Sequence, residues 1–307
     1  MTTLEAPPKT PLLANLTHRE TVSRWDKLLV ALLIGIPLGA TLFAMYAAWR
    51  WTDYLHAKDL VLLGVFYLFA SLGITVGFHR MLTHTAFEAP WFVRGMLLIF
   101  AMWGLEGSPI SWAAVHIKHH AYSDKEEDPH SPLQGFWHAH MGWLFTVRVD
   151  PVKYAPKQMQ DPVVRFIART AGWWALLGIL LPFAIGGWTG LLWASGVRIF
   201  LVHHVTWSVN SICHTFGSRP FRTGADRSTN NLLVGILGMG EGWHNNHHAF
   251  PRSAFHGLRL WEFDASGYFI QLLGKLGLAK NIIRVPDDVV QARREQGTMM
   301  SGKSKAA

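Results

Sequence analysis

The sequence predicts an all-α membrane protein, in which four transmembrane helices stand beneath a cytosolic helical cap. Half of the 307 residues are hydrophobic and only 16% are charged, a composition typical of membrane proteins. The chain also contains 17 histidines, many of them grouped at the edges of its apolar stretches. These observations predict a helical membrane domain with a histidine-ligated metal site on one rim.

The apolar stretches define the four helices, because a helix needs about 20 such residues to cross a bilayer. The predicted spans are residues 27–50, 60–84, 163–185 and 190–214. We expect "GGWTG" at Gly186–Gly190 to separate the last two, since glycine favours turns. A shorter apolar stretch, Phe92–Leu105, carries Arg94 and predicts an interfacial or re-entrant helix.

Loop charge predicts the orientation of these helices. Basic residues gather in the N-terminal tail and in the two long loops, so the positive-inside rule places both termini and both long loops in the cytoplasm. The predicted parts are a cytosolic tail (1–26), a membrane domain (27–286) whose cap comes from 85–162 and 215–286, and a polar C-terminal tail (287–307). We expect an integral, multi-pass protein of a bacterial cell membrane.

Charge and cysteine content narrow the possible ligands. The formal net charge of +8 suits a basic flank that faces anionic lipid. Nucleic acid is not expected as a partner, because no basic run is interleaved with exposed aromatic residues. The single cysteine, Cys213, excludes an intramolecular disulfide and a thiolate cluster. A bound metal would therefore take imidazole or carboxylate ligands.

Three histidine clusters, "HRMLTH", "HIKHH" and "HNNHH", predict a metal site. Their histidines are His79, His84, His116, His119, His120, His244, His247 and His248. Spacings of three and four place side chains on one face of an α-helix. The five-residue spacing of the first cluster does not quite do so, and we expect His84 to reach back from a fraying helix end.

A ninth histidine, His214, is expected at the same membrane boundary as the first cluster, because of the lengths of the predicted spans. A helix that starts at Leu60 crosses about 30 Å of hydrocarbon near His79, and one that starts at Gly190 emerges near Asn210 and His214. Nine imidazoles exceed one coordination sphere and so predict two metal ions. Imidazole suits zinc, copper, iron or nickel. Iron is our choice, because non-haem iron activates O2 for attack on unactivated C–H bonds.

Six segments between Gly73 and Pro251 carry a family resemblance. They are "GITVGFHRMLTH", "HIKHHAYSD", "DPHSP", "GFWHAHMGWLF", "WSVNSICHTFG" and "EGWHNNHHAFP". In this order they resemble the membrane fatty acid desaturases, specifically the Δ9 group that includes the stearoyl-CoA desaturases. The resemblance implies four membrane helices under a cytosolic cap, a di-iron centre and a narrow buried tunnel for an acyl chain.

The resemblance also implies roles for single residues. The iron ligands would be the nine histidines, with Asn210 holding a metal-bound water. Trp112 and Thr206 would shape the bend of the tunnel. Ala114 and Val115 replace an Arg-Asp pair of the animal acyl-CoA enzymes, and only Arg148 remains of a second basic pair. The carrier could therefore be coenzyme A, acyl-carrier protein or a glycerolipid.

The expected reaction reduces O2 with two electrons, removes two hydrogens from adjacent methylenes, and leaves a cis double bond and two waters. We see no fused haem-binding electron-carrier domain of the kind found in some relatives, so a separate donor, such as a ferredoxin or another reductase system, is expected. Tyr67, twelve residues before His79, is a candidate for the closed end of the tunnel, with lipid-facing packing as the alternative.

Two rival functions share parts of this pattern. A di-iron alkane or sterol hydroxylase has similar histidine clusters. A metal transporter should place polar residues at several depths of its spans, and apart from His203 and His204 we expect no such path here. We assign those two to hydrogen bonds between helices, with tunnel lining as the alternative. The acidic run Asp124–Asp128 is read as a solvated face that could also pair with basic loops or receive a donor protein.

Overall fold

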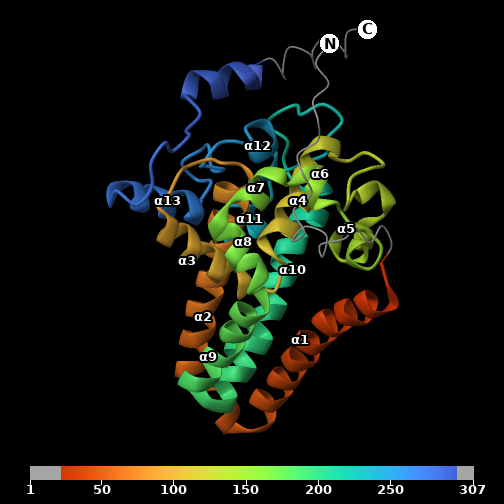
Figure 1. The fold of residues 1–307 in the computed structure, drawn as a ribbon, viewed down its shortest axis with the longest axis vertical. Coiled ribbons are helices and arrows are strands. Elements are labelled where there is room, and N and C mark those ends of the chain that lie inside the picture. The colour runs from red at the N-terminus through yellow and green to blue at the C-terminus, as the bar shows by residue number, and fades with distance from the viewer. Residues whose placement is uncertain (1–21, 296–307) are drawn as a thin grey trace.

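The protein is helical throughout the part that the computed structural model describes, residues 22–295. Within that range it has three isolated β-bridges and no strand. Its α-helices are α1 (Arg24–Arg50), α2 (Ala57–Leu72), α3 (Trp91–Met102), α4 (Pro109–Tyr122), α5 (Phe136–His140), α6 (Pro151–Tyr154), α7 (Pro156–Gln160), α8 (Pro162–Arg169), α9 (Ala171–Leu191), α10 (Arg198–Ser211), α11 (Leu232–Leu237), α12 (His244–Ala249) and α13 (Ala265–Lys275). Figure 1 shows α1, α2, α9 and α10 as an elongated stem, with the short helices gathered at one end.

Three helical stretches within residues 22–295 are long and apolar enough to cross a membrane. They are Arg24–Arg50, Thr52–Thr83 and Ala171–His214. The first two agree with the spans predicted at 27–50 and 60–84. The surface of α1 carries large apolar side chains, among them Leu29 and Ile36, each 64% exposed. Such a surface suits contact with lipid and not with water.

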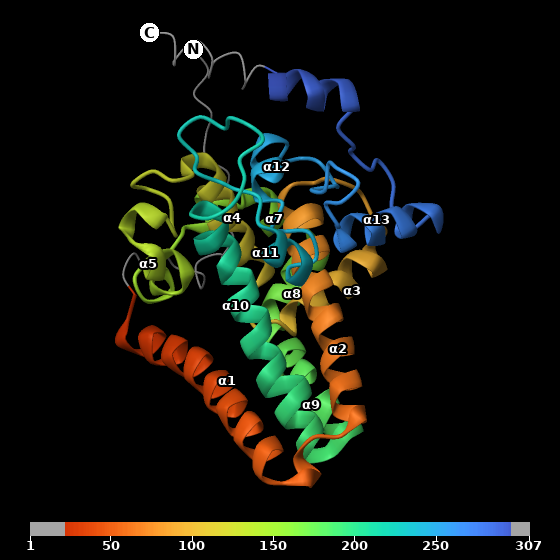
Figure 2. The ribbon, with the colours of Figure 1, turned by 180° about the vertical axis from the view of Figure 1, so that it is seen from behind.

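The third stretch changes direction at the glycine-rich segment. Gly187 has φ +66° and ψ −152°, which is not helical. Beyond it the chain returns antiparallel to α9, and the Ser195 hydroxyl donates to the Ile179 carbonyl at 2.9 Å. Figures 1 and 2 both show α9 and α10 side by side. The break predicted within "GGWTG" therefore lies at Gly187.

The helix predicted from residue 163 is divided near its start. α8 ends at Arg169 and α9 begins at Ala171. Thr170 between them has φ −103° and ψ 14°. Its hydroxyl donates to the Phe166 carbonyl at 2.7 Å and accepts from the Trp174 indole at 2.8 Å. These two bonds satisfy the Phe166 carbonyl at the end of α8 and the Trp174 indole in the first turn of α9. The long apolar helix therefore starts at Ala171, eight residues later than predicted.

A π-helix, η3 (Gly73–Thr83), continues α2 toward the cap. Gly73 and Gly77 let it lie close to α3, because a Cβ on Gly73 would be 2.1 Å from the Ala101 nitrogen. The His84 amide donates to the His79 carbonyl at 3.0 Å, an i→i+5 bond. His79 and His84 thus lie one turn apart on one face. The expectation that His84 reaches back from a fraying end was wrong, since it assumed α-helical periodicity.

An arginine inside the stem joins three helices. Arg198, at the start of α10, is fully buried. Its guanidinium donates to the carbonyls of Ala194, of Gly178 in α9 at 3.0 Å, and of Trp103 at the end of α3. These bonds satisfy a cation that lipid could not solvate, and they fix α3 and α9 against α10.

The predicted C-terminal tail is partly helical. Residues 287–295 form one more helix, beyond the thirteen named above, whereas 296–307 lie outside the described residues, as do residues 1–21 of the predicted N-terminal tail. Val290 is buried with Phe221 and Ala249. The guanidinium of Arg293 lies over the Phe250 ring at 5.1 Å. This short helix therefore packs on the cap.

Candidate metal centre

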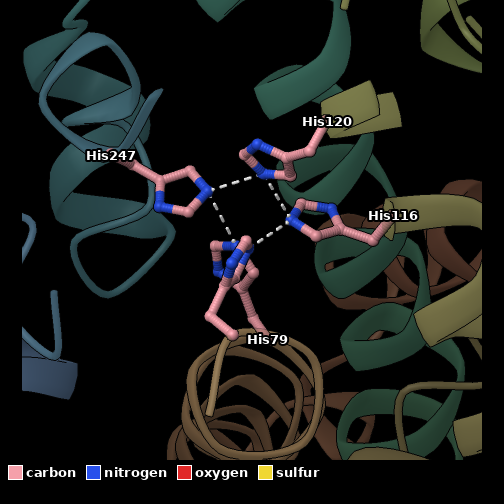
Figure 3. A group of neighbouring side chains, drawn as sticks. His79, His116, His120 and His247 are labelled. Atoms are coloured by element: carbon pink, nitrogen blue, oxygen red, sulfur yellow. Dashed lines mark hydrogen bonds between the residues drawn. The ribbon is translucent and has the colours of Figure 1, made fainter. Parts of the chain in front are cut away.

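The nine predicted histidines converge as two separate groups. The first contains His79, His84, His116, His120 and His247, and the second contains His119, His214, His244 and His248. Within each group, one ring nitrogen per histidine lies within 4.8 Å of all the others. Figure 3 shows four rings of the first group pointing toward a common centre. Each of the two groups could hold a metal ion.

Two helices contribute to both groups. In α4, His116 and His120 enter the first group, and His119 turns to the second. In α12, His247 enters the first group, while His244 and His248 enter the second. The short α12 thus stands opposite α4, and the two groups lie next to each other between them. Spacings of three and four residues produce this division because they select neighbouring faces of a helix.

The convergent atoms are Nε2 throughout. In the first group the Nε2 atoms of His84 and His116 are 2.9 Å apart, as are those of His247 and His120. In the second group the Nε2 atom of His244 is 2.9 Å from that of His214 and 3.1 Å from that of His248. Uniform orientation of this kind leaves each Nδ1 free to face outward.

Burial keeps most of these imidazoles neutral. It lowers the pKa of His116, His120 and His247 well below the usual value of 6.5, and the neighbouring histidines lower it further. Neutral imidazole is the form that binds a metal, since its lone pair is free. This donor set therefore fits transition-metal ions.

Carboxylates hold four of the rings from outside. The Nδ1 atom of His119 lies 3.0 Å from Asp128, that of His214 lies 2.9 Å from Asp124, that of His248 lies 2.9 Å from Asp226, and that of His79 lies 2.5 Å from Glu241. A carboxylate at Nδ1 fixes the tautomer and aims Nε2 at the metal position. Burial alone would raise the pKa of Asp128, but the His119 pairing lowers it below the usual range.

The reading of Asp124–Asp128 as a solvated face was only half right. Glu126 and Glu127 are exposed, whereas Asp124 and Asp128 are buried beside histidines. Sequence reasoning also gave no role to Asp226 or Glu241. The one local signal was that Asp124 and Asp128 follow a histidine cluster. Which members of an acidic run are buried depends on the fold, so the sequence alone did not separate these two from their exposed neighbours.

Glu241 is itself held by a buried cation. The Arg80 guanidinium lies 3.1 Å from Glu241 and 2.9 Å from Asp264, and Arg80 is fully buried. His256 approaches the same Glu241 carboxylate at 3.5 Å. Arg80 follows His79 directly in η3, so one π-helical turn supplies both a candidate ligand and the group that positions its carboxylate.

Two cavities run along the first group and meet at a common waist. Both are lined by Trp112, His116, Thr206 and Asn210. The inner cavity continues between α2 and α10 past Ser71, Ile74 and Val205 to Gly238. The outer cavity opens past Glu106 and Trp143 to Arg148. Trp112 and Thr206 therefore line both cavities, and Arg148 lines the outer one.

Tyr67 does not line either cavity. Its hydroxyl donates to the Leu237 carbonyl at 2.8 Å. Leu237 precedes Gly238, which lines the inner end of the inner cavity. Tyr67 therefore supports the loop at that end, one residue away from the cavity wall.

Comparison with known proteins identifies the family. The fatty acid desaturase model matches residues 60–263, which include all nine histidines of the two groups. The chain belongs to the fatty acid desaturase family. It is therefore an oxidoreductase that desaturates fatty acyl chains, and the hydroxylase and transporter alternatives are set aside.

Named relatives differ in bond position and acyl carrier. An sn-1 stearoyl-lipid 9-desaturase from Anabaena variabilis is 40% identical over 253 residues, covering 81% of this chain and 90% of that protein. A chloroplastic palmitoyl-monogalactosyldiacylglycerol delta-7 desaturase from Arabidopsis thaliana is 37% identical over 269 residues, covering 86% and 70%. An acyl-CoA C20 Delta5-desaturase from Anemone leveillei is 41% identical over 232 residues, covering 73% and 74%.

Three further histidines of the desaturase, His140, His203 and His204, lie outside both groups and contact neighbouring side chains. The Nδ1 atom of His204 is 3.0 Å from Nε2 of His140, whose own Nδ1 is 2.9 Å from the Ser211 hydroxyl. These contacts join α10 to α5, as expected of a buried polar group in a membrane helix. The ring of His203 stacks on Trp207 with centroids 4.8 Å apart. Neither His203 nor His204 lines the inner or the outer cavity.

Proposed function

We propose that this desaturase forms a cis double bond at the Δ9 position of a saturated acyl chain, with O2 as co-substrate and two electrons from a separate donor. One observation carries the proposal: the waist at Trp112 and Thr206 lies directly beside a candidate metal ligand, His116. A chain threaded through this waist presents a fixed pair of methylenes to the centre. The 40% identity to a 9-desaturase supports the bond position.

Two iron ions would occupy the histidine groups. The first group supplies five imidazoles, and the second supplies four, with Asn210 added through a water. Bound iron would supply the activation of O2 that removal of hydrogen from unactivated C–H bonds requires. The buried carboxylates of Asp124, Asp128, Asp226 and Glu241 would hold the ligand rings at their Nδ1 atoms.

The rest of the chain positions the substrate and excludes water. Ile74, Val202, Val205 and Val209 line the inner cavity with branched apolar side chains. They bind methylenes without competing hydrogen bonds and hold the alkyl chain in one path. A dry cavity also protects the reacting site from side reactions with water.

The carrier proposed is a glycerolipid. Arg148 is the one Lys or Arg among the described residues that line the outer cavity, and Asp26 lies 3.6 Å from it. Coenzyme A carries several phosphates and would call for several cations at the mouth. Leu33 of α1 also lines this cavity. The N-terminal part of α1 diverges from the stem, which gives the mouth a side that faces lipid (Figure 2).

The proposed topology has four membrane crossings, because the reversal at Gly187 divides Ala171–His214 into two antiparallel halves. The cap and both termini would face the cytoplasm of a bacterial cell.

Expression in a bacterial host that makes no Δ9 lipids tests the proposal. Mass spectrometry of derivatised fatty acids should find the new double bond at Δ9, first in intact glycerolipids. Purified enzyme should convert a lipid-bound stearoyl chain faster than stearoyl-CoA. A bond at another position would contradict Δ9, and preference for stearoyl-CoA would contradict the glycerolipid carrier. His119→Ala is the control without activity.

A further inference from the structure

A third cavity reaches the histidine groups separately from the two acyl cavities. It has a volume of about 600 Å³ and shares no lining residue with the inner or the outer cavity. Its walls come from the loop after α4, the loop at 223–226, and the residues around α12. In Figure 1, α12 lies at the end of the molecule away from the apolar stem. The acyl chain therefore has no need of this cavity, and its role must be separate.

The floor of this cavity belongs to both histidine groups. His84 and His120 come from the first group and His248 from the second. Asp226, which holds His248 at 2.9 Å, lines the same floor. A molecule in this cavity would thus touch imidazole edges of both candidate metal positions. The acyl chain meets the two groups through other members, His79, His116 and His244.

Small side chains line part of the wall of this cavity, and its rim is basic. Ala121, Gly224 and Ala225 line the cavity with little side-chain volume, which lets a visiting group approach closely. Lys125 and Arg252 line its rim and are exposed. Two further arginines, Arg222 and Arg227, are exposed in the adjoining loop. Glu126 and Glu127 are the exposed acids beside Lys125, so cations outnumber acids on this face.

We propose that this cavity is the docking site of an acidic one-electron carrier protein, such as a ferredoxin. The inference rests on the proposed function, in which one acyl –CH2–CH2– unit, O2, two electrons and two protons give –CH=CH– and two waters. Two carriers, each oxidised by one electron, supply the electrons in turn. A one-electron carrier is required because metal ions accept single electrons, whereas a nicotinamide gives up a hydride. Opposite charge steers and orients such encounters.

Binding of a purified, acidic [2Fe–2S] ferredoxin to the full chain in nanodiscs tests the inference. The dissociation constant should rise about tenfold in Lys125→Glu/Arg252→Glu and should rise with salt in the parent. Lys275→Glu, at the end of α13 and outside this cavity, is the matched control and should bind as the parent does. A carbodiimide should crosslink ferredoxin carboxylates to Lys125. Ala225→Trp should slow ferredoxin oxidation by filling the cavity while the iron content stays at the parent's level.

The outcomes separate this inference from the proposed function. The docking site is overturned if the double variant binds ferredoxin as tightly as the parent does. It is also overturned if the parent shows no saturable binding to either ferredoxin or an acidic haem carrier. If the double variant lost affinity for anionic vesicles while its ferredoxin binding stayed unchanged, the basic rim would be a lipid contact. That result would also overturn the docking site. Failure of the parent to desaturate with any electron donor, dithionite included, would instead count against the proposed function.

Discussion

The Nδ1 atom of His214 lies 2.9 Å from the Oδ2 atom of Asp124, and both side chains are fully buried. Asp124 stands in the loop after α4, and His214 ends the helix that follows α10, 90 residues later. The same carboxylate oxygen also accepts the Arg227 amide. One side chain therefore fixes a candidate ligand and the loop that borders the third cavity.

Removal of the Asp124 charge should weaken metal binding. In Asp124→Asn the iron affinity should fall about 10-fold to 100-fold, because the ring of His214 loses the partner that orients it. Chelator competition on the purified protein measures this. Glu126→Gln, a change of the same kind at an exposed neighbour, should leave the affinity unchanged. Equal affinities in the two variants would mean that Asp124 does not support the second group.

The two histidine groups should respond differently to the loss of one ligand. Metal analysis of the parent should give close to two irons per chain. His244→Ala leaves three imidazoles in its group and should lower the value to about one, whereas His84→Ala leaves four and should retain more metal. His138→Ala, outside both groups, is the control. Zinc that supported full turnover, or one iron in the parent, would contradict the di-iron proposal.

Acyl chain length should depend on the inner end of the inner cavity. Ser71→Phe narrows the inner cavity, which Ser71 lines, and should shift the preference toward shorter chains. Tyr67→Ala removes the support of Leu237 and should shift it toward longer ones. Leu68→Phe, on the exposed face of α2, is the control. Competition between acyl chains of different length measures the preference. The double bond should stay in place, and its movement would contradict threading from the outer cavity.

Glu106 should make the stability of the protein depend on pH. Burial raises the pKa of its carboxyl to about 8, although the Trp207 indole, which donates to Oε2 at 3.3 Å, opposes the rise. The unfolded chain has a value near 4.5. Between these values the folded state binds the proton more strongly, so the free energy of unfolding falls as pH rises from about 4.5 to 8.

Thermal unfolding of the parent and of Glu106→Gln tests this dependence. Glutamine keeps the shape without the ionisation, so its unfolding temperature should fall less between pH 5 and pH 8.5. Glu127→Gln, at an exposed position, should follow the parent. Parallel pH profiles in the parent and Glu106→Gln would show that Glu106 does not ionise in this range.

The sequence was most informative where local periodicity decides the outcome. Spacings of three and four in "HIKHH" and "HNNHH" predicted converging side chains, and α4 and α12 bring His116 and His244 to the expected centre. The π-helix between Gly73 and Thr83 was missed, because its wider turn depends on how closely Gly73 meets Ala101 in α3. A contact between distant segments leaves no periodic trace in either of them.

The carboxylates around the centre were missed for a related reason. Glu241 and Arg80 are 161 residues apart, and nothing near either residue indicates the other. The same holds for Asp226, in the loop before α11, and His248, in α12. Ligand histidines are visible because they cluster, whereas the groups that orient them come singly from across the fold.

Arg198 has a consequence for how the chain enters the membrane during synthesis. An arginine near the centre of a membrane helix costs about 2.5–3.5 kcal/mol on insertion. The carbonyls that accept its hydrogen bonds belong to Trp103, Gly178 and Ala194, all of which leave the ribosome before Arg198 does. The acceptors are thus already present when the guanidinium arrives. α10 can then partition into the bilayer as the second arm of a hairpin with α9, and not as a solitary helix.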